Sequence, residues 1–290
     1  MTTVNVVDDT GTQGELREQI ESILARVIPL VKPATGLDVP DTVNFRITPV
    51  ETYRRDQVAN MGRNLRKCHR TIPYWRRPFV AALTAAVLLP VFRLTIAKVG
   101  GILVAGATFS LPKSAESETV FVPEGLQHNG ILTDEKYLTA LTVHELLHQA
   151  QNHASGHRAN WIANRAVTLL DPGGINHLEE GHAIWGDRSI TRELYGTAVD
   201  TRSAPKSEQY KAIPRRGLQK KLDVYEGGCL LVMSAVRAVG LETFNKVWAD
   251  HRLLPNPSEV ADAVAAYNAD APTQPELWAA RLDGAEAAEV

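Results

Sequence analysis

The 290-residue sequence predicts an α+β fold that is mostly helical, with a small mixed or antiparallel sheet beside one central helix. Apolar residues recur at intervals of three and four in several segments, as they do on the buried face of a helix. The β-prone segments are short and lie only between residues 43 and 123. The central helix carries two histidines at positions i and i+4, and the sheet is expected to lie next to this helix.

The chain divides most simply at residue 128. Residues 1–128 are expected to form an N-terminal helical region with the sheet. Residues 129–290 are expected to form a helical lobe with a metal site and the C-terminal helices. A chain of this length also suits one continuous catalytic domain, and both arrangements stay open here.

The N-terminal half begins with an amphipathic helix. Residues Gly14 to Val31 carry apolar side chains at helical spacing: Leu16, Ile20, Ile23, Leu24, Val27 and Ile28. Val43 to Val50 is expected to be a short strand. Two antiparallel strands, within Gly100–Ser110 and Thr119–Pro123, are expected on either side of a polar loop.

The C-terminal half predicts four helices. The first runs from Glu135 to about Asn152, with Thr133 or Asp134 as its cap. A second covers Ile175 to Asp187. A third, apolar helix covers Tyr225 to Val239 and ends at Gly240, and a further helix follows from Leu241 to Trp248.

Two segments admit more than one interpretation. Phe79 to Phe92 is apolar, but a membrane-spanning helix needs about 20 residues, so a buried core helix is expected, with a surface-embedded helix as the alternative. Residues Arg54 to Arg77 hold eight Lys or Arg and one acid. A solvated helix face is expected there, and a patch for an acidic substrate or phosphate is the alternative.

The composition of the chain limits the partners and the cellular location that the sequence predicts. A formal net charge of -2 gives no global basic field for nucleic acid. Two cysteines, Cys68 and Cys229, are too few for a disulfide framework, so a cytoplasmic location is expected. Met1 to Glu15 lacks the apolar run of a secretory signal. No membrane span and no nucleic-acid partner are therefore expected, and the sequence does not predict the oligomeric state.

The strongest motif is His144-Glu145-Leu146-Leu147-His148, which fits H-E-x-x-H. On a helix, residues i and i+4 lie on one face, so His144 and His148 can bind one metal ion. Glu145 projects to one side of that ion and can act as the general base on a water. Zn²⁺ is the expected cofactor.

A catalytic zinc usually has three protein ligands, and several residues could supply the third. His153 and His157 follow soon after the motif but would require a sharp chain reversal. A glutamate from a second predicted helix, Glu180 or Glu179, is the other candidate, and Gly181 permits close packing of that helix against the first.

Residues around this second motif could support the site. His182 and His177 flank the ligand, and either could contact a substrate oxygen or simply pack near the metal helix. Metal-bound histidines usually hydrogen-bond to another acceptor. Asp187 lies seven residues after Glu180, on the same helical face, and is expected to be this acceptor, with a backbone carbonyl as the alternative.

The sequence resembles known metallopeptidases in these motifs. Residues 177–185 are similar to the third-ligand helix of the gluzincins, in which the Glu before Gly is the ligand. The segment Lys220 to about Pro257 extends the similarity to an actinobacterial family of zincin-like metallopeptidases, some of them labelled as associated with deazaflavin-cofactor biosynthesis. The similarity covers roughly residues 129–263. It implies a zincin-like fold and a zinc site with Glu180 as the third ligand, Glu179 being the alternative, and it implies no particular substrate.

The expected activity is therefore that of a zinc metallohydrolase, most simply a peptidase that hydrolyses peptide or amide bonds. Tyr225 is the preferred donor to a developing oxyanion, because it matches the family's Tyr-x-x-Gly, and Tyr210 and His182 are alternatives. The strand in Gly100–Ser110 could bind an extended substrate at its edge. A zinc enzyme acting on a small metabolite, or a vestigial zinc-binding protein, remains an alternative.

Overall fold

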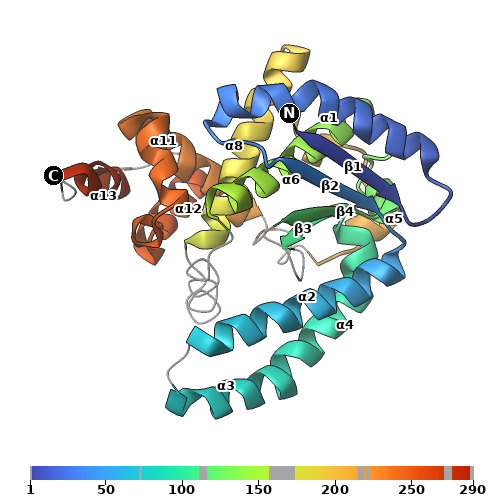
Figure 1. The fold of residues 1–290 in the computed structure, drawn as a ribbon, viewed down its shortest axis with the longest axis horizontal. Helices are drawn as coiled ribbons and strands as arrows, with labels where there is room; N and C mark the ends of the chain where they lie inside the picture. Colours follow the sequence, from blue (N-terminus) through green and yellow to red (C-terminus); the bar gives the residue numbers. More distant parts are fainter. Residues whose placement is uncertain are drawn as a thin grey trace.

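The protein was analysed as a computed structural model. It describes residues 2–71, 74–110, 116–156, 174–214, 219, 222–270 and 276–287. Helices surround a small sheet, and a pair of helical segments projects from this body (Figure 1). The α+β class predicted from the sequence is confirmed.

The sheet is mixed and has the strand order β1-β2-β4-β3. Its strands are β1 (Thr3–Asp8), β2 (Thr42–Ile47), β3 (Gly106–Ser110) and β4 (Ser117–Phe121). β1 pairs parallel with β2, β2 pairs parallel with β4, and β3 pairs antiparallel with β4. The predicted antiparallel pair is confirmed, and β3 is the last strand at one side of the sheet. β1 was not predicted, although Val4 and Val6 alternate with Thr3 and Asn5 in the pattern typical of a strand with one buried face.

Three long helices build the main core with the sheet. They are α1 (Gly14–Thr35), α6 (Glu135–Ala154) and α8 (Ile175–Tyr195). α1 buries the predicted face against the sheet and α6, and Ile20, Leu24 and Val27 are completely shielded from solvent. α6 also packs against β3 and β4. The predicted position of the sheet beside the histidine helix is therefore correct.

The C-terminal helices cover α8 on its other side. α11 (Gly228–Asn245) makes the closest packing, and Gly240 interrupts it with a φ of 80°, at the stop that the sequence predicted. The short segment η4, a π-helical turn at Asp223–Gly227, precedes α11. The remaining elements are α5 (Pro123–His128), η3 (Thr201–Ser203), α9 (Glu208–Lys211), η5 (Lys246–Trp248), η6 (His251–Leu253), α12 (Pro257–Asn268) and α13 (Glu276–Ala287).

The main core contains residues from both sides of the predicted boundary at residue 128. Val43 and Phe45 of β2 belong to the same buried cluster as Leu146 of α6 and Val232 of α11. A second, smaller cluster surrounds Tyr53. The division at residue 128 stays a prediction.

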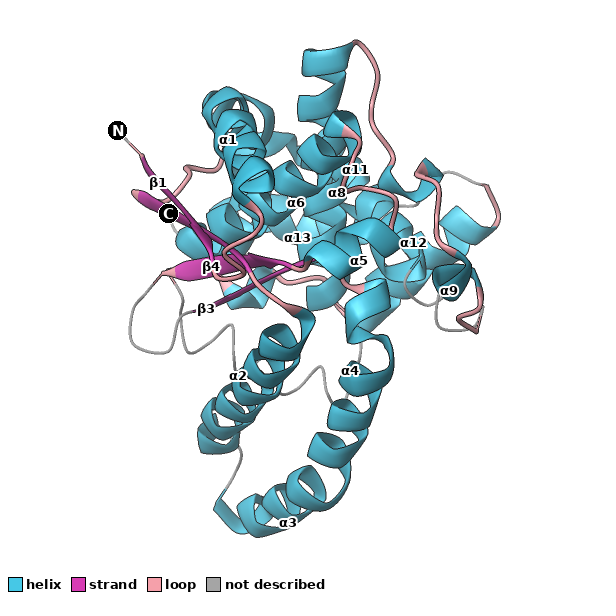
Figure 2. Cartoon of the chain, turned by 90° about the vertical axis from the view of Figure 1, so that its right-hand side faces the viewer, coloured by secondary structure: helices cyan, strands magenta, loops and turns pink. Residues whose placement is uncertain are grey.

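A helical arm projects from the body, and it corrects one prediction. It comprises α2 (Val50–Thr71), η1 (Tyr74–Arg76), α3 (Arg77–Leu83), the π-helical segment η2 (Thr84–Leu88) and α4 (Leu89–Leu103). α2 and α4 lie side by side and lead back to the body (Figure 2). The expected buried helix at Phe79–Phe92 is wrong, because Phe79 is 73% exposed and Val91 is 56% exposed.

Pro90 explains the change of helical geometry within the arm. Proline has no amide hydrogen, so it cannot bond to the carbonyl four residues earlier in an α-helix. The π-helical turn η2 ends two residues before Pro90, and wider turns of this kind accommodate such interruptions.

Two segments of the described chain are long and apolar enough to cross a membrane by length and composition. Tyr74–Lys98 has 7% of its most apolar window buried, and Asp223–Trp248 has 39% buried. The second segment packs along α8 and is part of the body.

Candidate metal site

The H-E-x-x-H segment lies on α6, as predicted. Asp134 caps this helix by accepting hydrogen bonds from the backbone amides of Lys136 and Tyr137. Leucine and valine side chains around the motif are buried and hold the helix against the core. The rings of His144 and His148 therefore lie on one face, with their centroids 4.8 Å apart.

Glu180 of α8 completes a cluster with these histidines. Its Oε2 lies 3.2 Å from Nε2 of His144 and 3.5 Å from Nε2 of His148. One ligand atom from each of the three residues lies within 4.8 Å of the others. Two imidazole nitrogens and one carboxylate oxygen that converge in this way fit the donor set of a divalent metal such as zinc. The three residues could hold a metal ion.

The charged groups in and around this cluster strongly shift the pKa values of Glu180 and His144. Burial opposes the charged form of Glu180, but the adjacent histidines lower its pKa well below the ordinary value. Burial likewise disfavours charged His144, but Asp187 and Glu180 raise its pKa to about 10. The site therefore concentrates negative charge that a bound cation would neutralise.

The outer nitrogen of each histidine is also hydrogen-bonded. Nδ1 of His144 lies 3.1 Å from Oδ2 of Asp187, which is the contact expected from the sequence. Nδ1 of His148 lies 2.9 Å from Oε1 of Gln151. These partners hold Nδ1 and direct Nε2 toward Glu180, as is typical of metal-binding histidines. Burial raises the pKa of Asp187 to about 6, although His144 opposes the increase.

Gln151 was not predicted as part of the site. Its side-chain nitrogen donates to the backbone carbonyl of Glu179 and lies 3.1 Å from Nδ1 of His182. Gln151 therefore links α6 to α8 directly beside His148. The available signal was its position three residues after His148, which places both on the same helical face.

His182 occupies a different place from the one expected of a substrate contact. It is fully buried, its ring stacks on Phe244, and it packs edge-on against Trp248. It is not among the described residues that line the cavity beside the cluster. Of its two expected roles, packing near the metal helix agrees with this position, whereas direct contact with a substrate oxygen does not.

Glu145 lies beside the cluster without belonging to it. The hydroxyl of Thr108 on β3 donates to its Oε2 at 2.7 Å, and Thr119 lies 2.7 Å from the same hydroxyl. Gly106, also on β3, leaves room for this carboxylate, because an added Cβ would lie 3.1 Å from Oε1. β3 therefore positions Glu145, a relationship that sequence reasoning missed.

Tyr225 lies on the π-helical turn η4 and lines the same cavity. Its ring stacks on His144, with centroids 5.8 Å apart and planes only 7° apart. Burial raises its pKa well above the ordinary value, and Glu180 raises it further through its negative charge and by accepting a hydrogen bond from the phenol. The phenol therefore stays protonated at neutral pH and can donate a hydrogen bond.

Gly181 allows a close helix crossing, but its partner differs from the predicted one. A Cβ at Gly181 would lie 2.0 Å from the carbonyl carbon of Gly228, and one at Gly228 would lie 2.1 Å from the carbonyl oxygen of His177. The two glycines therefore bring α8 and α11 together. The expected approach to the first motif helix is wrong for this residue.

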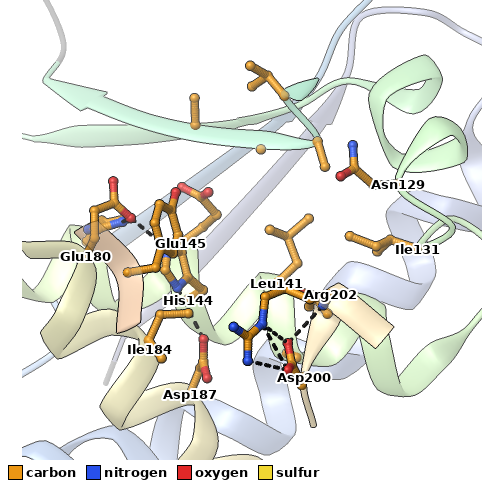
Figure 3. Close-up of a pocket in the computed structure, with 18 of the residues that line it drawn as sticks. Asn129, Ile131, Leu141, His144, Glu145, Glu180, Ile184, Asp187, Asp200 and Arg202 are labelled. Carbon is orange, nitrogen blue, oxygen red and sulfur yellow. Dashed lines mark hydrogen bonds and ion pairs between the residues drawn. The ribbon is translucent and has the colours of Figure 1, made fainter. Parts of the chain in front are cut away.

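The cavity has a volume of about 830 Å³ and lies between α6, α8, β3 and η4. Figure 3 shows His144, Glu145 and Glu180 at one side of it and the Asp200–Arg202 pair at the other. Both of its arginines are ion-paired, since Arg188 contacts Glu226 at 2.7 Å and Arg202 also reaches Glu226 at 2.9 Å, and Lys206 donates to the backbone carbonyls of Asn129 and Thr201. The cluster that could hold a metal therefore forms part of the wall of this cavity.

The other sequence candidates lie as follows. His153 is exposed in the last turn of α6, and His157 lies outside the described residues. Glu179 is buried and lines the cavity, but it is not part of the ligand cluster. Tyr210 also lines the cavity, and His177 is partly buried on α8. Most side chains of the basic segment after Asn60 lie outside the described set.

Comparisons with known proteins add little. Neither the models of known protein families nor the curated proteins give a match. A search of solved structures finds a protein from Chloroflexus aurantiacus, described as a "putative hydrolase with a novel fold", with 16% identity and a TM-score of 0.44. The alignment covers 94% of this chain and 91% of that one. A similarity this weak does not indicate that the two proteins share a function.

Proposed function

We propose that this protein is a zinc-dependent hydrolase of the zincin type, with His144, His148 and Glu180 as ligands and Glu145 as general base. The observation that supports it is the convergence of these three donors within 4.8 Å, beside a cavity that Glu145 also lines. The resemblance of the two motifs to gluzincins agrees with this assignment.

Bound zinc would supply Lewis acidity, which polarises a carbonyl oxygen and makes a water easier to deprotonate. The chain supplies the remaining functions. Glu145 takes the proton of the attacking water on its carboxylate and later delivers it to the leaving nitrogen or oxygen. Thr108 keeps that carboxylate oriented through its 2.7 Å hydrogen bond.

Tyr225 is the proposed donor to the oxyanion that forms when water attacks a carbonyl. Its hydroxyl group is protonated and lines the cavity near Glu180. A donor held in place before the reaction stabilises developing negative charge without reorganisation. Asp187 and Gln151 keep the two imidazoles oriented while this happens.

An amide bond in a peptide is the first proposed substrate. β3 is the last strand of the sheet, and its residues Gly106, Ala107 and Thr108 line the cavity. An extended peptide could therefore pair with this strand next to Glu145, as in recognition by strand addition.

A small amide or ester is the second candidate, and the size of the cavity favours it. A volume of about 830 Å³ lies within the range of about 300–1,000 Å³ that holds small molecules. The two candidates share the same ligands and base, so they differ in substrate and agree in mechanism.

The test combines metal analysis with turnover. We expect the purified protein to contain about one zinc per chain, and Glu145→Gln to keep this metal while losing at least about a hundredfold in activity. Activity would be sought with mixed fluorogenic peptides and with small aryl amides and esters. Glu193→Gln, an exposed change on α8, is the matched control. Protein without bound metal, or a Glu145→Gln variant with parental turnover, would contradict the proposal.

A further inference from the structure

The helical arm exposes an apolar surface that the body does not cover. Along its second half, Phe79 is 73% exposed, Leu94 is 64% exposed and Val91 is 56% exposed. Leu83 and Val87 are also more than a third exposed. Monomeric soluble proteins rarely expose so many large apolar side chains on one element, and such surfaces usually mark an interaction site.

The charge of the arm is opposite to that of the rest of the chain. Residues 50–103, which form the arm, contain ten Lys or Arg and two Asp or Glu. The remainder has 21 Lys or Arg against 31 Asp or Glu, so an overall charge of -2 conceals a strongly basic arm on an acidic body. A surface that combines this charge with exposed apolar groups matches an anionic lipid bilayer.

The tip of the arm has the composition of a membrane interface. Tyr74 is 83% exposed and Trp75 is 70% exposed, at the turn between α2 and α3. The guanidinium of Arg76 lies 4.3 Å from the centre of the Trp75 ring. Tyrosine and tryptophan concentrate at the headgroup level of bilayers, and arginine can contact lipid phosphates there.

Two ordinary explanations of an apolar helix do not apply to Tyr74–Lys98. A core helix would be buried, whereas only 7% of this segment's apolar window is buried. A signal sequence would lie near the N-terminus, whereas this segment follows β1, α1, β2 and α2. The polar helix α2 packs beside α4, and its basic residues would oppose passage through a bilayer.

We propose that the arm docks the protein on the surface of an anionic lipid bilayer. Phe79, Leu94 and the aromatic tip enter the interface, and Arg76 and Arg93 contact lipid phosphates. Docking of this kind is peripheral, and the body with its metal-binding cluster stays in water. The basic segment and the apolar segment of the sequence thereby have one common function.

The test measures co-sedimentation of the full-length protein with vesicles. Vesicles with about 30% phosphatidylglycerol are compared with pure phosphatidylcholine, at about 0.1 M and about 0.5 M salt. We expect binding to the anionic vesicles that falls at high salt. The double variants Phe79→Ser/Leu94→Ser and Arg76→Gln/Arg93→Gln should each bind at least about tenfold more weakly.

Matched variants on the body provide the controls. Val7→Ser/Met233→Ser removes two exposed apolar groups, and Arg17→Gln/Lys211→Gln removes two exposed charges. Both should bind vesicles as the parent does, and all four variants should keep parental circular dichroism because the altered side chains are exposed.

Four results would overturn the proposal. Arm variants could bind as tightly as the parent, or the parent could show no preference for anionic vesicles. Sedimentation velocity could instead show a dimer that Phe79→Ser/Leu94→Ser dissociates, without vesicle binding, in which case a second copy covers the arm. Binding of a short RNA duplex without vesicle binding would assign the arm to nucleic acid.

Discussion

Nδ1 of His144 and Oδ2 of Asp187 lie 3.1 Å apart, and both side chains are buried. The imidazole comes from α6 and the carboxylate from α8, two turns along the helix from Glu180. This hydrogen bond fixes the ring so that Nε2 points at the ligand cluster. If the site binds a metal, as proposed, this hydrogen bond couples its affinity for that metal to the packing of two helices.

Replacing Asp187 with Asn should weaken metal binding by about 10- to 100-fold, because the amide is a poorer acceptor for the imidazole. A competition titration against a zinc chelator measures the change. Glu193→Gln alters an exposed acid on the same helix and should leave the affinity unchanged. Equal affinities for both variants would show that Asp187 does not support the site.

Glu180→Ala should remove most bound zinc, whereas Glu179→Ala should retain most of it. Only Glu180 contributes an oxygen to the cluster, and Glu179 interacts with Gln151 through its backbone carbonyl, which the substitution preserves. Metal content after dialysis against buffer measures the difference. The reverse ranking would transfer the ligand role to Glu179.

Thr108→Val should lower kcat by about tenfold and leave KM nearly unchanged. The substitution keeps the shape of the side chain but removes the hydroxyl that holds Glu145, and a neutral-to-charged hydrogen bond contributes about 1.5–3 kcal/mol. Thr108→Ser keeps the hydroxyl and should restore kcat. Steady-state kinetics of the three proteins decide the matter, and a serine variant as slow as the valine variant would refute the positioning role.

Gly181→Ala should destabilise the protein by at least about 3 kcal/mol, because its Cβ has no room against the backbone of Gly228. Gly14→Ala is the control, since a Cβ there meets nothing within 4 Å and α1 begins at that residue. Chemical denaturation should show a large loss for the first and little change for the second. Similar stability of both variants would mean that the helices can separate freely.

His182 should make the fold less stable in acid. Burial lowers its pKa to about 3, so the unfolded chain binds a proton below about 6.5 that the folded chain refuses. Stability due to this residue is then complete above pH 6.5 and falls as the pH drops toward 3, by up to about 1.4 kcal/mol per unit.

The variant His182→Phe keeps an aromatic ring between Phe244 and Trp248 and cannot be protonated. Urea denaturation from pH 7 to pH 4 should show a shallower decline for this variant than for the parent. Parallel curves would mean that His182 accepts a proton without cost in the folded state.

The sequence predicted the parts of the site that follow from helical geometry alone. His144 and His148 had to share a face because they are four residues apart, and Asp187 lies on the face of Glu180 because seven residues make about two turns. The same geometry turns His182, two residues from Glu180, to the opposite side of α8. His182 was nevertheless kept as a candidate substrate contact, because this geometry was not applied to it.

The residues that the sequence did not reveal act between elements that are far apart in the chain. Thr108 reaches Glu145 from β3, and Gly181 meets Gly228 of α11. Neither contact leaves a periodic pattern. The prediction that Phe79–Phe92 is buried was wrong for a related reason, because an apolar composition does not show whether other helices cover a segment.

The arm is anchored where the cavity is formed. Tyr53 in the first turn of α2 and Leu103 at the end of α4 both line the cavity, and Gly106 follows three residues after Leu103. Any tilt of the arm must therefore move two parts of that wall together with the start of β3. By thermodynamic linkage, a ligand that changes the width of the cavity would therefore also change the angle between the arm and the body.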